Sequence, residues 1–294
     1  MHDEPTGNFR QLAVEPTLAK VRKLQEDRGF RDRNGLFFIE GVRNFIWALD
    51  YHSSLDAILY SEKLLINPVA RKLVRKMKRS GVPFVRLTPE EFRSISGAER
   101  ASGVAAIVVR RVLALDQLNP MGECWTALEH FRSPGNFGTL MRSSAATGGA
   151  GFILLGNAID PFDPSVVRAT MGSLFTQKIA RASAAELQRW TRQHNVQVIG
   201  ASPDGAIDYD RIRYSRPTLL VLGTERSGLT AQQRSLCHRI VRIPMAERID
   251  SLNLGVAGSL LMYRVFRESG RVGGRSGRSG ERPPTSNGRK SAFS

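Results

Sequence analysis

The feature that most constrains the fold is the apolar run Thr218-Leu-Leu-Val-Leu222. Such a continuous run has no polar face, which is typical of a strand buried on both sides in a parallel sheet. Other short runs with strand character recur along the chain, at residues 36–39, 55–60, 82–87, 105–112, 125–130, 152–155, 179–180, 196–201 and 239–243. Helical patterns lie between many of them. They include residues 17–27, residues 184–193, and a helix through about Thr147 that Asn136 can cap. Strands that alternate with helices predict an α/β fold.

The helical patterns carry recognisable start and stop signals. Thr88 is placed as an N-cap with Pro89 at the first helical position, and Gly81 ends the preceding helix. That preceding helix, residues 67–79, turns an apolar face inward and a basic face outward. The basic face is either an ordinary solvated surface or a surface that contacts nucleic-acid phosphates. Its outward residues are Arg71, Lys72, Arg75, Lys76, Lys78 and Arg79.

The length of 294 residues predicts about two domains. Polar and breaker residues between positions 113 and 123 mark the boundary. We therefore expect a flexible N-terminus over residues 1–16 and a first domain over 17–112. A linker over 113–123 and a second domain over 124–268 follow. Residues 269–294, dominated by Gly, Arg, Ser and Pro, are expected to be a disordered basic tail.

Charge and composition restrict the function classes. The chain has 43 Lys and Arg against 27 Asp and Glu, a net charge of +16, which indicates a polyanionic partner such as nucleic acid. No apolar run is long enough to span a membrane, and the first residues do not resemble a secretory signal. The two cysteines, Cys124 and Cys237, form no metal-binding motif. We expect no membrane partner, no metal and a reducing, cytoplasmic location.

Three polar loops each follow an apolar strand, at residues 132–142, 223–228 and 244–253. In open α/β sheets, ligands bind at the carboxyl ends of the strands, so these loops predict one shared site. None contains Cys or His, which argues against covalent catalysis by a Ser–His or Cys–His pair. No phosphate-binding P-loop sequence occurs. The segment 148–151 is rich in glycine but follows a helix, and we interpret it as a helix C-cap.

The third loop leads into a helix with unusual composition. Pro244 ends the strand before it, and Asp250 or Ser251 can cap a helix that begins near Leu252. Two glycines inside this helix each cost about 1 kcal/mol relative to alanine, so another element must approach them closely. They are Gly255 and Gly258, and the apolar residues at helical spacing are Leu252, Val256, Leu260 and Tyr263.

Three motifs, in order, resemble those of the SpoU/TrmH-type RNA 2′-O-ribose methyltransferases of the SPOUT superfamily. They are Ser133-Pro-Gly-Asn-Phe-Gly-Thr-Leu-Met-Arg142, Leu220-Val-Leu-Gly-Thr-Glu-Arg-Ser-Gly-Leu229 and the segment from Ile243-Pro-Met to Asp250-Ser-Leu-Asn-Leu254. The first half, with segments 35–42 and 103–106, resembles the L30e-like substrate-binding domain that often precedes them. The resemblance covers about residues 17–266.

The resemblance implies an L30e-like α/β domain followed by an α/β methyltransferase domain with a C-terminal trefoil knot. It also implies S-adenosylmethionine as methyl donor, bound largely by backbone groups. By position, the donor-binding residues are Leu222, Gly223, Ile243, Met245, Ser251 and Leu252. A homodimer is implied as well, with the helix after Asn253 near the subunit interface, which would explain Gly255 and Gly258.

The resemblance places the active site on Asn136, Arg142, Glu225, Ser251 and Asn253. Arg142 corresponds to the family's key arginine. It acts either as the base or, more easily for a guanidinium, which stays charged in proteins, as a clamp on the target's phosphate. Asn136 and Asn253 would orient Arg142 or the ribose, and Glu225 could pair with Arg142. The sequence departs from the family pattern at two places. Glu247 stands where many relatives have glycine, and Arg226-Ser227 stands in the second motif where many have glycine and another small or polar residue. Because of these differences, the resemblance does not identify the substrate.

The expected function is therefore methyl transfer from S-adenosylmethionine to a ribose 2′-OH of structured RNA, by a cytoplasmic homodimer. Ribosomal RNA of the 23S type is the preferred substrate, and transfer RNA stays open. A catalytically inactive RNA-binding assembly or resistance factor is the alternative from another class. A nicotinamide-dependent oxidoreductase is disfavoured because the chain has no glycine-rich dinucleotide fingerprint.

Overall fold

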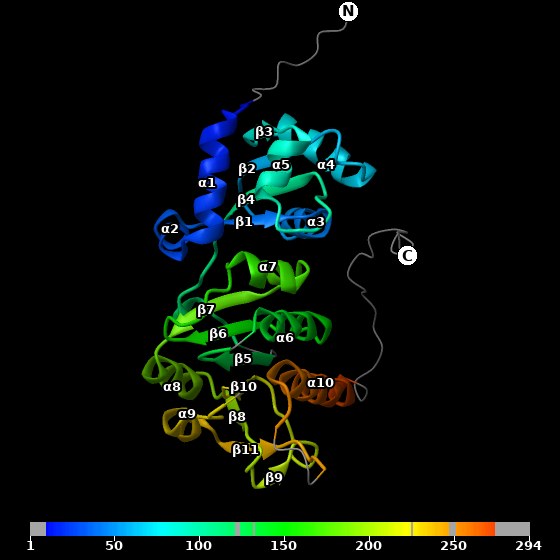
Figure 1. The fold of residues 1–294 in the computed structure, drawn as a ribbon. Coiled ribbons are helices and arrows are strands. Elements are labelled where there is room, and N and C mark those ends of the chain that lie inside the picture. Colours follow the sequence, from blue (N-terminus) through cyan, green and yellow to red (C-terminus); the bar gives the residue numbers. More distant parts are fainter. Residues whose placement is uncertain (1–9, 121–123, 132, 225, 247–250, 274–294) are drawn as a thin grey trace, which may run out of the picture.

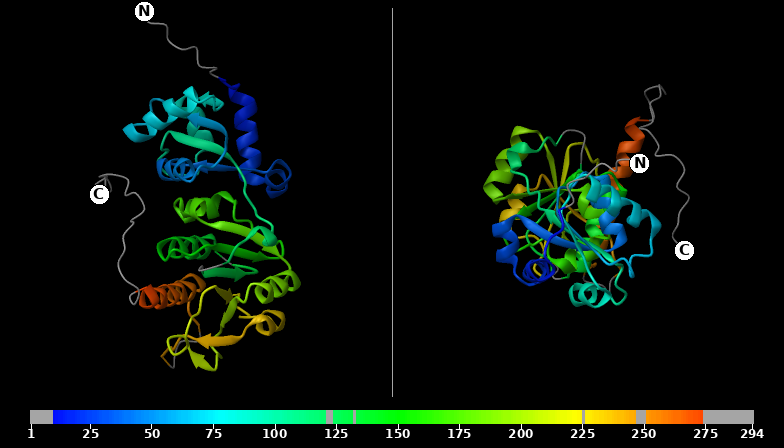
Figure 2. Two further views of the ribbon diagram at one scale, coloured as in Figure 1. Left: turned by 180° about the vertical axis from the view of Figure 1, so that it is seen from behind. Right: turned by 90° about the horizontal axis from the view of Figure 1, so that it is seen from above.

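The structure, a computed structural model, describes residues 10–120, 124–131, 133–224, 226–246 and 251–273. Two sheets, each with its own helices, are stacked along the long axis of the molecule (Figure 1, Figure 2). We call the part that contains the first sheet the N-terminal unit and the part that contains the second sheet the C-terminal unit. The expected α/β fold with a separate N-terminal domain is confirmed.

The N-terminal unit is built on a mixed four-stranded sheet in the order β1-β4-β2-β3. Its strands are β1 (Leu36–Glu40), β2 (Leu55–Tyr60), β3 (Phe84–Arg86) and β4 (Val104–Val109). Helices α1 (Val14–Glu26) and α5 (Pro89–Ile95) pack on one face, and α3 (Val42–Asp50) and α4 (Pro68–Arg79) on the other; α2 (Arg28–Asn34) follows α1. The predicted cap of α5 is confirmed, because Thr88 and Glu91 form a reciprocal capping box.

The start of the chain differs from expectation. Helix α1 begins at Val14, three residues earlier than predicted, and the residues before it are not free: Leu12 and Arg10 exchange backbone hydrogen bonds with Phe84 of β3. The expectation of a flexible segment is therefore wrong for residues 10–16, and residues 1–9 lie outside the described residues. Pairing with an edge strand gives no sequence signal, since it uses only backbone groups.

The C-terminal unit contains a seven-stranded sheet whose neighbouring strands all pair in parallel, in the order β7-β6-β5-β10-β8-β11-β9. Its strands are β5 (Cys124–Leu128), β6 (Gly151–Leu155), β7 (Lys178–Ala182), β8 (Gln197–Ala201), β9 (Ile207–Asp208), β10 (Thr218–Leu222) and β11 (Arg239–Arg242). Its helices are α6 (Pro134–Ala146), α7 (Pro164–Thr170), α8 (Ala184–Gln193), α9 (Ala231–Leu236) and α10 (Leu254–Gly273). Two short 3₁₀ turns are η1 (Leu115–Gln117) and η2 (Ser173–Thr176).

Strand β10 is buried on both faces, as its composition predicts. Leu220 and Leu222 belong to the core shared with α6 and α10, whereas Leu219 and Val221 belong to the opposite core, with Trp190 of α8. Helices α6, α7 and α10 lie on one side of the sheet, and α8 and α9 on the other (Figure 1). A continuous apolar strand is thus explained by helices on both faces.

The two units share a buried junction. Arg31 of α2 is only 2% exposed, and its guanidinium forms two hydrogen bonds to Asp160 of the C-terminal unit, at 3.0 and 2.7 Å. It also donates to the backbone oxygen of Leu24. Beside it, the rings of Phe37 and Phe162 pack with their centroids 4.9 Å apart. Breaking a buried pair such as Arg31–Asp160 costs about 3–5 kcal/mol, so this contact fixes the units together.

Two helix starts in the C-terminal unit differ from the sequence prediction. Ser133, not Asn136, caps α6, because its hydroxyl accepts a hydrogen bond from the N–H of Gly135 and Pro134 occupies the first helical position. Helix α10 starts at Leu254, with Asn253 as its cap, rather than near Leu252. It also continues through residue 273, which places its last turn inside the segment expected to be a tail. Gly148 does end α6 in the left-handed conformation that the C-cap prediction requires.

The trefoil knot stays a prediction, because residues 247–250, on the path between β11 and α10, lie outside the described residues. The linker residues 121–123 and the tail residues 274–294 lie outside them too. Over the described ranges, no helix is both long enough and apolar enough to cross a membrane.

Candidate active site

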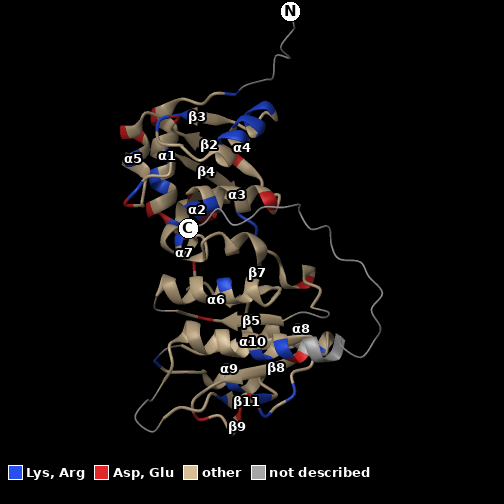
Figure 3. Cartoon of the chain, turned by 90° about the vertical axis from the view of Figure 1, so that its right-hand side faces the viewer, with Lys and Arg blue, Asp and Glu red and all other residues tan. Residues whose placement is uncertain are grey.

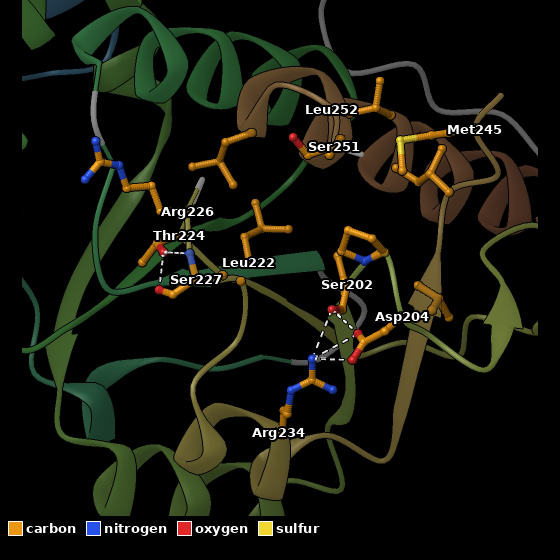
Figure 4. A pocket seen from close by; sticks show the side chains of 18 residues that line it. Ser202, Asp204, Leu222, Thr224, Arg226, Ser227, Arg234, Met245, Ser251 and Leu252 are labelled. Atoms are coloured by element: carbon orange, nitrogen blue, oxygen red, sulfur yellow. Dashed lines mark hydrogen bonds and ion pairs between the residues drawn. The ribbon is translucent and has the colours of Figure 1, made fainter. Parts of the chain in front are cut away.

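The strand order reverses between β5 and β10, and a cavity opens beside this point at the carboxyl ends of the strands. Its volume is about 480 Å³, within the range of small-ligand sites. The loops after β8, β10 and β11 line it, together with the first turns of α10 (Figure 4). All six residues predicted to bind the methyl donor are among the lining residues: Leu222, Gly223, Ile243, Met245, Ser251 and Leu252.

The loop after β10 is closed by its own backbone. Thr224 and Gly228 exchange two backbone hydrogen bonds, at 2.9 and 3.1 Å, and the hydroxyls of Thr224 and Ser227 lie 2.8 Å apart. Gly223 cannot carry a side chain here, because a Cβ atom would lie 2.2 Å from the carbonyl carbon of Gly228. This loop therefore presents a narrow backbone wall to the cavity, with Arg226 exposed at its rim.

The loop after β8 is a wall that the sequence analysis missed. Arg234 of α9 donates hydrogen bonds to Ser202 and to both carboxylate oxygens of Asp204, and these three side chains meet at one side of the cavity (Figure 4). Its hydrogen bonds to Asp204 hold the pKa of that carboxyl below its usual range, so the pair stays ionised at neutral pH. The turn sequence Ser202-Pro-Asp-Gly205 directly after a strand was the signal that could have identified this wall.

Asn253 joins two of the predicted motifs. Its side-chain oxygen accepts hydrogen bonds from the N–H groups of Gly255 and Val256, which caps α10. Its amide nitrogen donates to the side-chain oxygen of Asn136, at 2.8 Å. The expected meeting of Asn136 and Asn253 is therefore present, with both amides held at the start of their helices.

Arg142 is the predicted site residue that does not reach this cavity. It lies two turns along α6 from Asn136, is exposed, and is not among the lining residues. Within the described part of the chain, its guanidinium has no hydrogen bond or ion pair. Glu225 and Glu247 lie outside the described residues, so the pairing of Glu225 with Arg142 stays a prediction.

The glycines of α10 have an explanation within the same chain. A Cβ atom on Gly258 would lie 2.3 Å from Leu140 of α6, and one on Gly255 would lie 3.1 Å from Thr139. The expectation that a second subunit requires these glycines is wrong, because α6 already occupies the space. Four of the residues that α10 turns outward are instead apolar: Val256, Leu260, Tyr263 and Phe266.

Other catalytic chemistries find no support in the described residues. Burial raises the pKa of the Cys124 thiol to about 12 and that of Cys237 to about 11, so both are protonated at neutral pH and are poor nucleophiles. Among the residues that the structure describes, no three His, Cys, Asp or Glu side chains are grouped to hold a metal ion.

Family comparisons agree with this arrangement of units. A sequence model of the SpoU rRNA methylase family matches residues 125–263. This range contains the strands of the C-terminal unit in full, apart from Cys124, the first residue of β5. A second model, of an MRM3-like substrate binding domain, matches residues 15–106.

Individual relatives extend over nearly the whole chain. A 23S rRNA (uridine(2479)-2′-O)-methyltransferase from Streptomyces viridochromogenes is 30% identical over 259 residues, 85% of this chain and 88% of that protein. The crystal structure of an AdoMet-bound rRNA methyltransferase from Sinorhizobium meliloti is 32% identical, with a TM-score of 0.80 over 89% of this chain and 98% of that one. The crystal structure of the SpoU methyltransferase AviRb from S. viridochromogenes is 29% identical. Its TM-score is 0.78, over 89% of this chain and 99% of that one.

The chain therefore belongs to the SpoU rRNA methylase family.

Proposed function

We propose that this protein transfers a methyl group from S-adenosylmethionine to a ribose 2′-OH of ribosomal RNA, with RNA of the 23S type as the preferred substrate. The observation that carries the proposal is the cavity at the carboxyl ends of β8, β10 and β11, which six separately predicted residues line. The names of the relatives, which include a 23S rRNA 2′-O-methyltransferase, support the choice of substrate.

The cavity suits a nucleoside that carries a charged amino-acid chain. Leu222, Ile243, Met245 and Leu252 provide apolar surface, and the loops around them provide backbone groups and hydroxyls. The polar lining residues are Ser202, Asp204, Thr224, Ser227, Arg234 and Ser251. S-adenosylmethionine supplies a methyl group already activated by its positively charged sulfur, so the protein's own task is to position the ribose and remove a proton.

We assign the ribose side of the reaction to Asn136, Arg142, Ser251 and Asn253. The Asn253–Asn136 hydrogen bond fixes the two amides at the edge of the cavity, where they can orient an incoming hydroxyl. Arg142 is better suited to hold the phosphate next to the target ribose than to accept a proton, because a guanidinium stays charged in proteins. Glu225 keeps its predicted place in the active site, outside the described residues.

We infer that RNA is bound first by α4 of the N-terminal unit. Four of its basic residues, Lys72, Arg75, Lys76 and Arg79, are exposed and have no hydrogen bond or ion pair in the described ranges. Basic residues gather on this helix in Figure 3. Arg71 and Lys78, which were expected to face outward, are engaged: Arg71 donates to the backbone of Leu65, and Lys78 donates to Tyr60 and lies over the Phe84 ring. These contacts hold the helix and leave four cations for phosphates.

We propose that the protein is a homodimer that pairs through the outer face of α10. Val256 and Tyr263 are 46% and 47% exposed, and Leu260 and Phe266 complete the apolar face. An exposed apolar patch of this kind marks a contact surface. Arg142 faces solvent on the adjacent α6, so a second copy packed on this surface would cover it.

We also retain the division into residues 17–112 and 124–268 as substrate-binding and methyltransferase domains, with 113–123 as linker. The cytoplasm, where ribosomal RNA is available, is the proposed location. Two free cysteines agree with a reducing compartment.

Transfer of tritiated methyl groups from S-adenosylmethionine to total RNA, separated into ribosomal and transfer RNA, tests the proposal. We expect label in ribosomal RNA, resistant to alkali at the methylated position. Arg142→Ala should lower the rate about a hundredfold or more, the size expected for a lost electrostatic contact in the transition state. Arg189→Ala on α8 is the matched control and should have little effect.

Three outcomes would change the conclusion. Label in transfer RNA alone would change the proposed substrate from ribosomal RNA to transfer RNA. Binding of RNA without any transfer would favour the inactive RNA-binding factor. Near-normal turnover by Arg142→Ala would remove Arg142 from the mechanism.

A further inference from the structure

A second cavity, of about 370 Å³, lies at the junction of the two units. The N-terminal unit lines it with the turn after α3, residues 51–54, and with residues 108–111 at the end of β4. The C-terminal unit lines it with residues 174–179, which include part of η2 and the start of β7. It shares no lining residue with the cavity proposed for the methyl donor. Its size is that of a small-ligand site.

The charged residues that line this junction cavity are all cationic: Arg110, Arg111 and Lys178. The ammonium of Lys178 lies over the Trp125 ring, 5.8 Å from its centroid, so Arg110 and Arg111 supply the charge next to the ligand. Arg110 is held in place by an ion pair with Asp32 and by the Phe162 ring, 5.2 Å from its guanidinium. Arg111 is exposed and has no hydrogen bond or ion pair to any residue that the structure describes. No Asp or Glu is among the described lining residues, so the cavity favours an anionic ligand.

The rim of the cavity carries an exposed aromatic ring on a rigid support. Tyr51 is 51% exposed, and its ring stacks on that of Trp47, with centroids 5.7 Å apart and planes 25° apart. The turn that follows is tied to α3, since the N–H groups of His52 and Ser53 donate to the carbonyls of Leu49 and Ala48. His52 adopts a positive φ of 53°, which is uncommon outside glycine and reverses the chain sharply there.

A supported, half-exposed ring beside cations is the combination that binds unpaired nucleotides. Bases of any sequence stack on aromatic side chains, and Arg or Lys neutralise the phosphates next to them. A paired helix cannot offer a base to such a cavity, because its bases are stacked inside. An acidic peptide would satisfy the cations but would leave the flat face of Tyr51 without a matching partner.

We propose that the junction cavity binds one unpaired nucleotide of the RNA substrate, with its base stacked on Tyr51 and its phosphate on Arg111. The inference rests on the proposed function in one respect, that the substrate is RNA. It adds an RNA contact to those proposed for α4 and for the active site, and both units build it together.

Fluorescence anisotropy with a labelled ten-nucleotide oligouridine, without S-adenosylmethionine, measures this contact directly in the full chain. Tyr51→Ala should weaken binding about tenfold, the effect of removing one base-stacking side chain. Tyr51→Phe keeps the ring and should bind as the parent protein does. Both changes are at an exposed side chain, and unchanged thermal unfolding would confirm that the variants fold.

The phosphate contact has its own readout. Arg111→Ala should lower the slope of log affinity against log salt by about 0.7, the value for one phosphate contact on a single strand. Arg192→Ala, at an exposed position on α8, is the matched control and should leave the slope unchanged. Polyglutamate at an equal concentration of charges should displace the labelled oligonucleotide poorly. The proposal is overturned if Tyr51→Ala binds the oligonucleotide like the parent protein, or if polyglutamate competes equally well.

The two proposals can fail independently. If the parent protein transfers no methyl group to ribosomal RNA but binds the oligonucleotide in a Tyr51-dependent way, the proposed reaction fails and the junction site stands. If methyl transfer occurs and Tyr51→Ala binds the oligonucleotide as tightly as the parent protein, the reaction stands and the junction site is rejected.

Discussion

Helices α4 and α10 both pack one apolar face on a sheet, yet they present opposite surfaces to solvent. The outer face of α4 carries Lys72, Arg75, Lys76 and Arg79, whereas the outer face of α10 carries Val256, Leu260, Tyr263 and Phe266. The buried faces are similar in kind, so packing alone does not explain the difference. The outer faces therefore indicate different partners: phosphates for α4 and a second copy of the chain for α10.

Charge reversal on α4 should give the largest effect. The triple variant Lys72→Glu, Arg75→Glu, Lys76→Glu should weaken binding to ribosomal RNA about a hundredfold at moderate salt and flatten the salt slope by about 2 to 3. Filter binding across a salt series measures both. Reversal of Arg189 and Arg192 on α8 is the control, and an equal loss there would mean that net charge, rather than α4, attracts the RNA.

A charge on the outer face of α10 should act on assembly instead. Tyr263→Glu should weaken self-association about thirtyfold, equivalent to about 2 kcal/mol for a central interface residue. Sedimentation velocity over a concentration series measures it. The parent protein sedimenting as an active monomer would reject the dimer, and Arg267→Glu, also exposed on α10, tests whether any added charge has the same effect.

The caps of the two helices offer the smallest and most selective test. Asn67 accepts a hydrogen bond from the N–H of Ala70 in α4, and Asn253 does the same for Gly255 in α10. Replacing either by alanine should cost about 1 kcal/mol of stability, measured by thermal unfolding. Only Asn253→Ala also removes the hydrogen bond to Asn136, so only that variant should lower the methyl-transfer rate. Equal loss of activity in Asn67→Ala would show that stability alone is responsible.

Strong local signals made much of the fold predictable. The bounds of β10 and α8 are as expected, because a continuous apolar run and a capping serine at position 183 mark them. Short elements such as α2, α9 and β9 were missed, since elements of two to seven residues carry too little periodicity. The cap of α6 was misplaced because Ser133 and Asn136 are both good capping residues, and Pro134 decides between them.

The site was partly predictable for a physical reason. The loops after β10 and β11 were predicted from polar segments that follow apolar strands. The family motifs selected the six donor-binding residues, all of which line one cavity. Periodicity identifies the faces of α10 but not which one is buried, and the glycines that suggested a subunit contact fit against Leu140 instead. Arg234 and Asp204 were missed because they come together only when α9 folds beside the end of β8.

The buried pair Arg31–Asp160 bears on how a target ribose is selected. Since this pair and the Phe37–Phe162 contact hold the units together, the separation between α4 and the methyl-donor cavity is set during folding. If RNA binds α4 as proposed, this fixed separation selects the target ribose by its distance along the RNA. Inserting base pairs between the α4 contact and the target would then shift the modified nucleotide by the same number of positions, whatever its base.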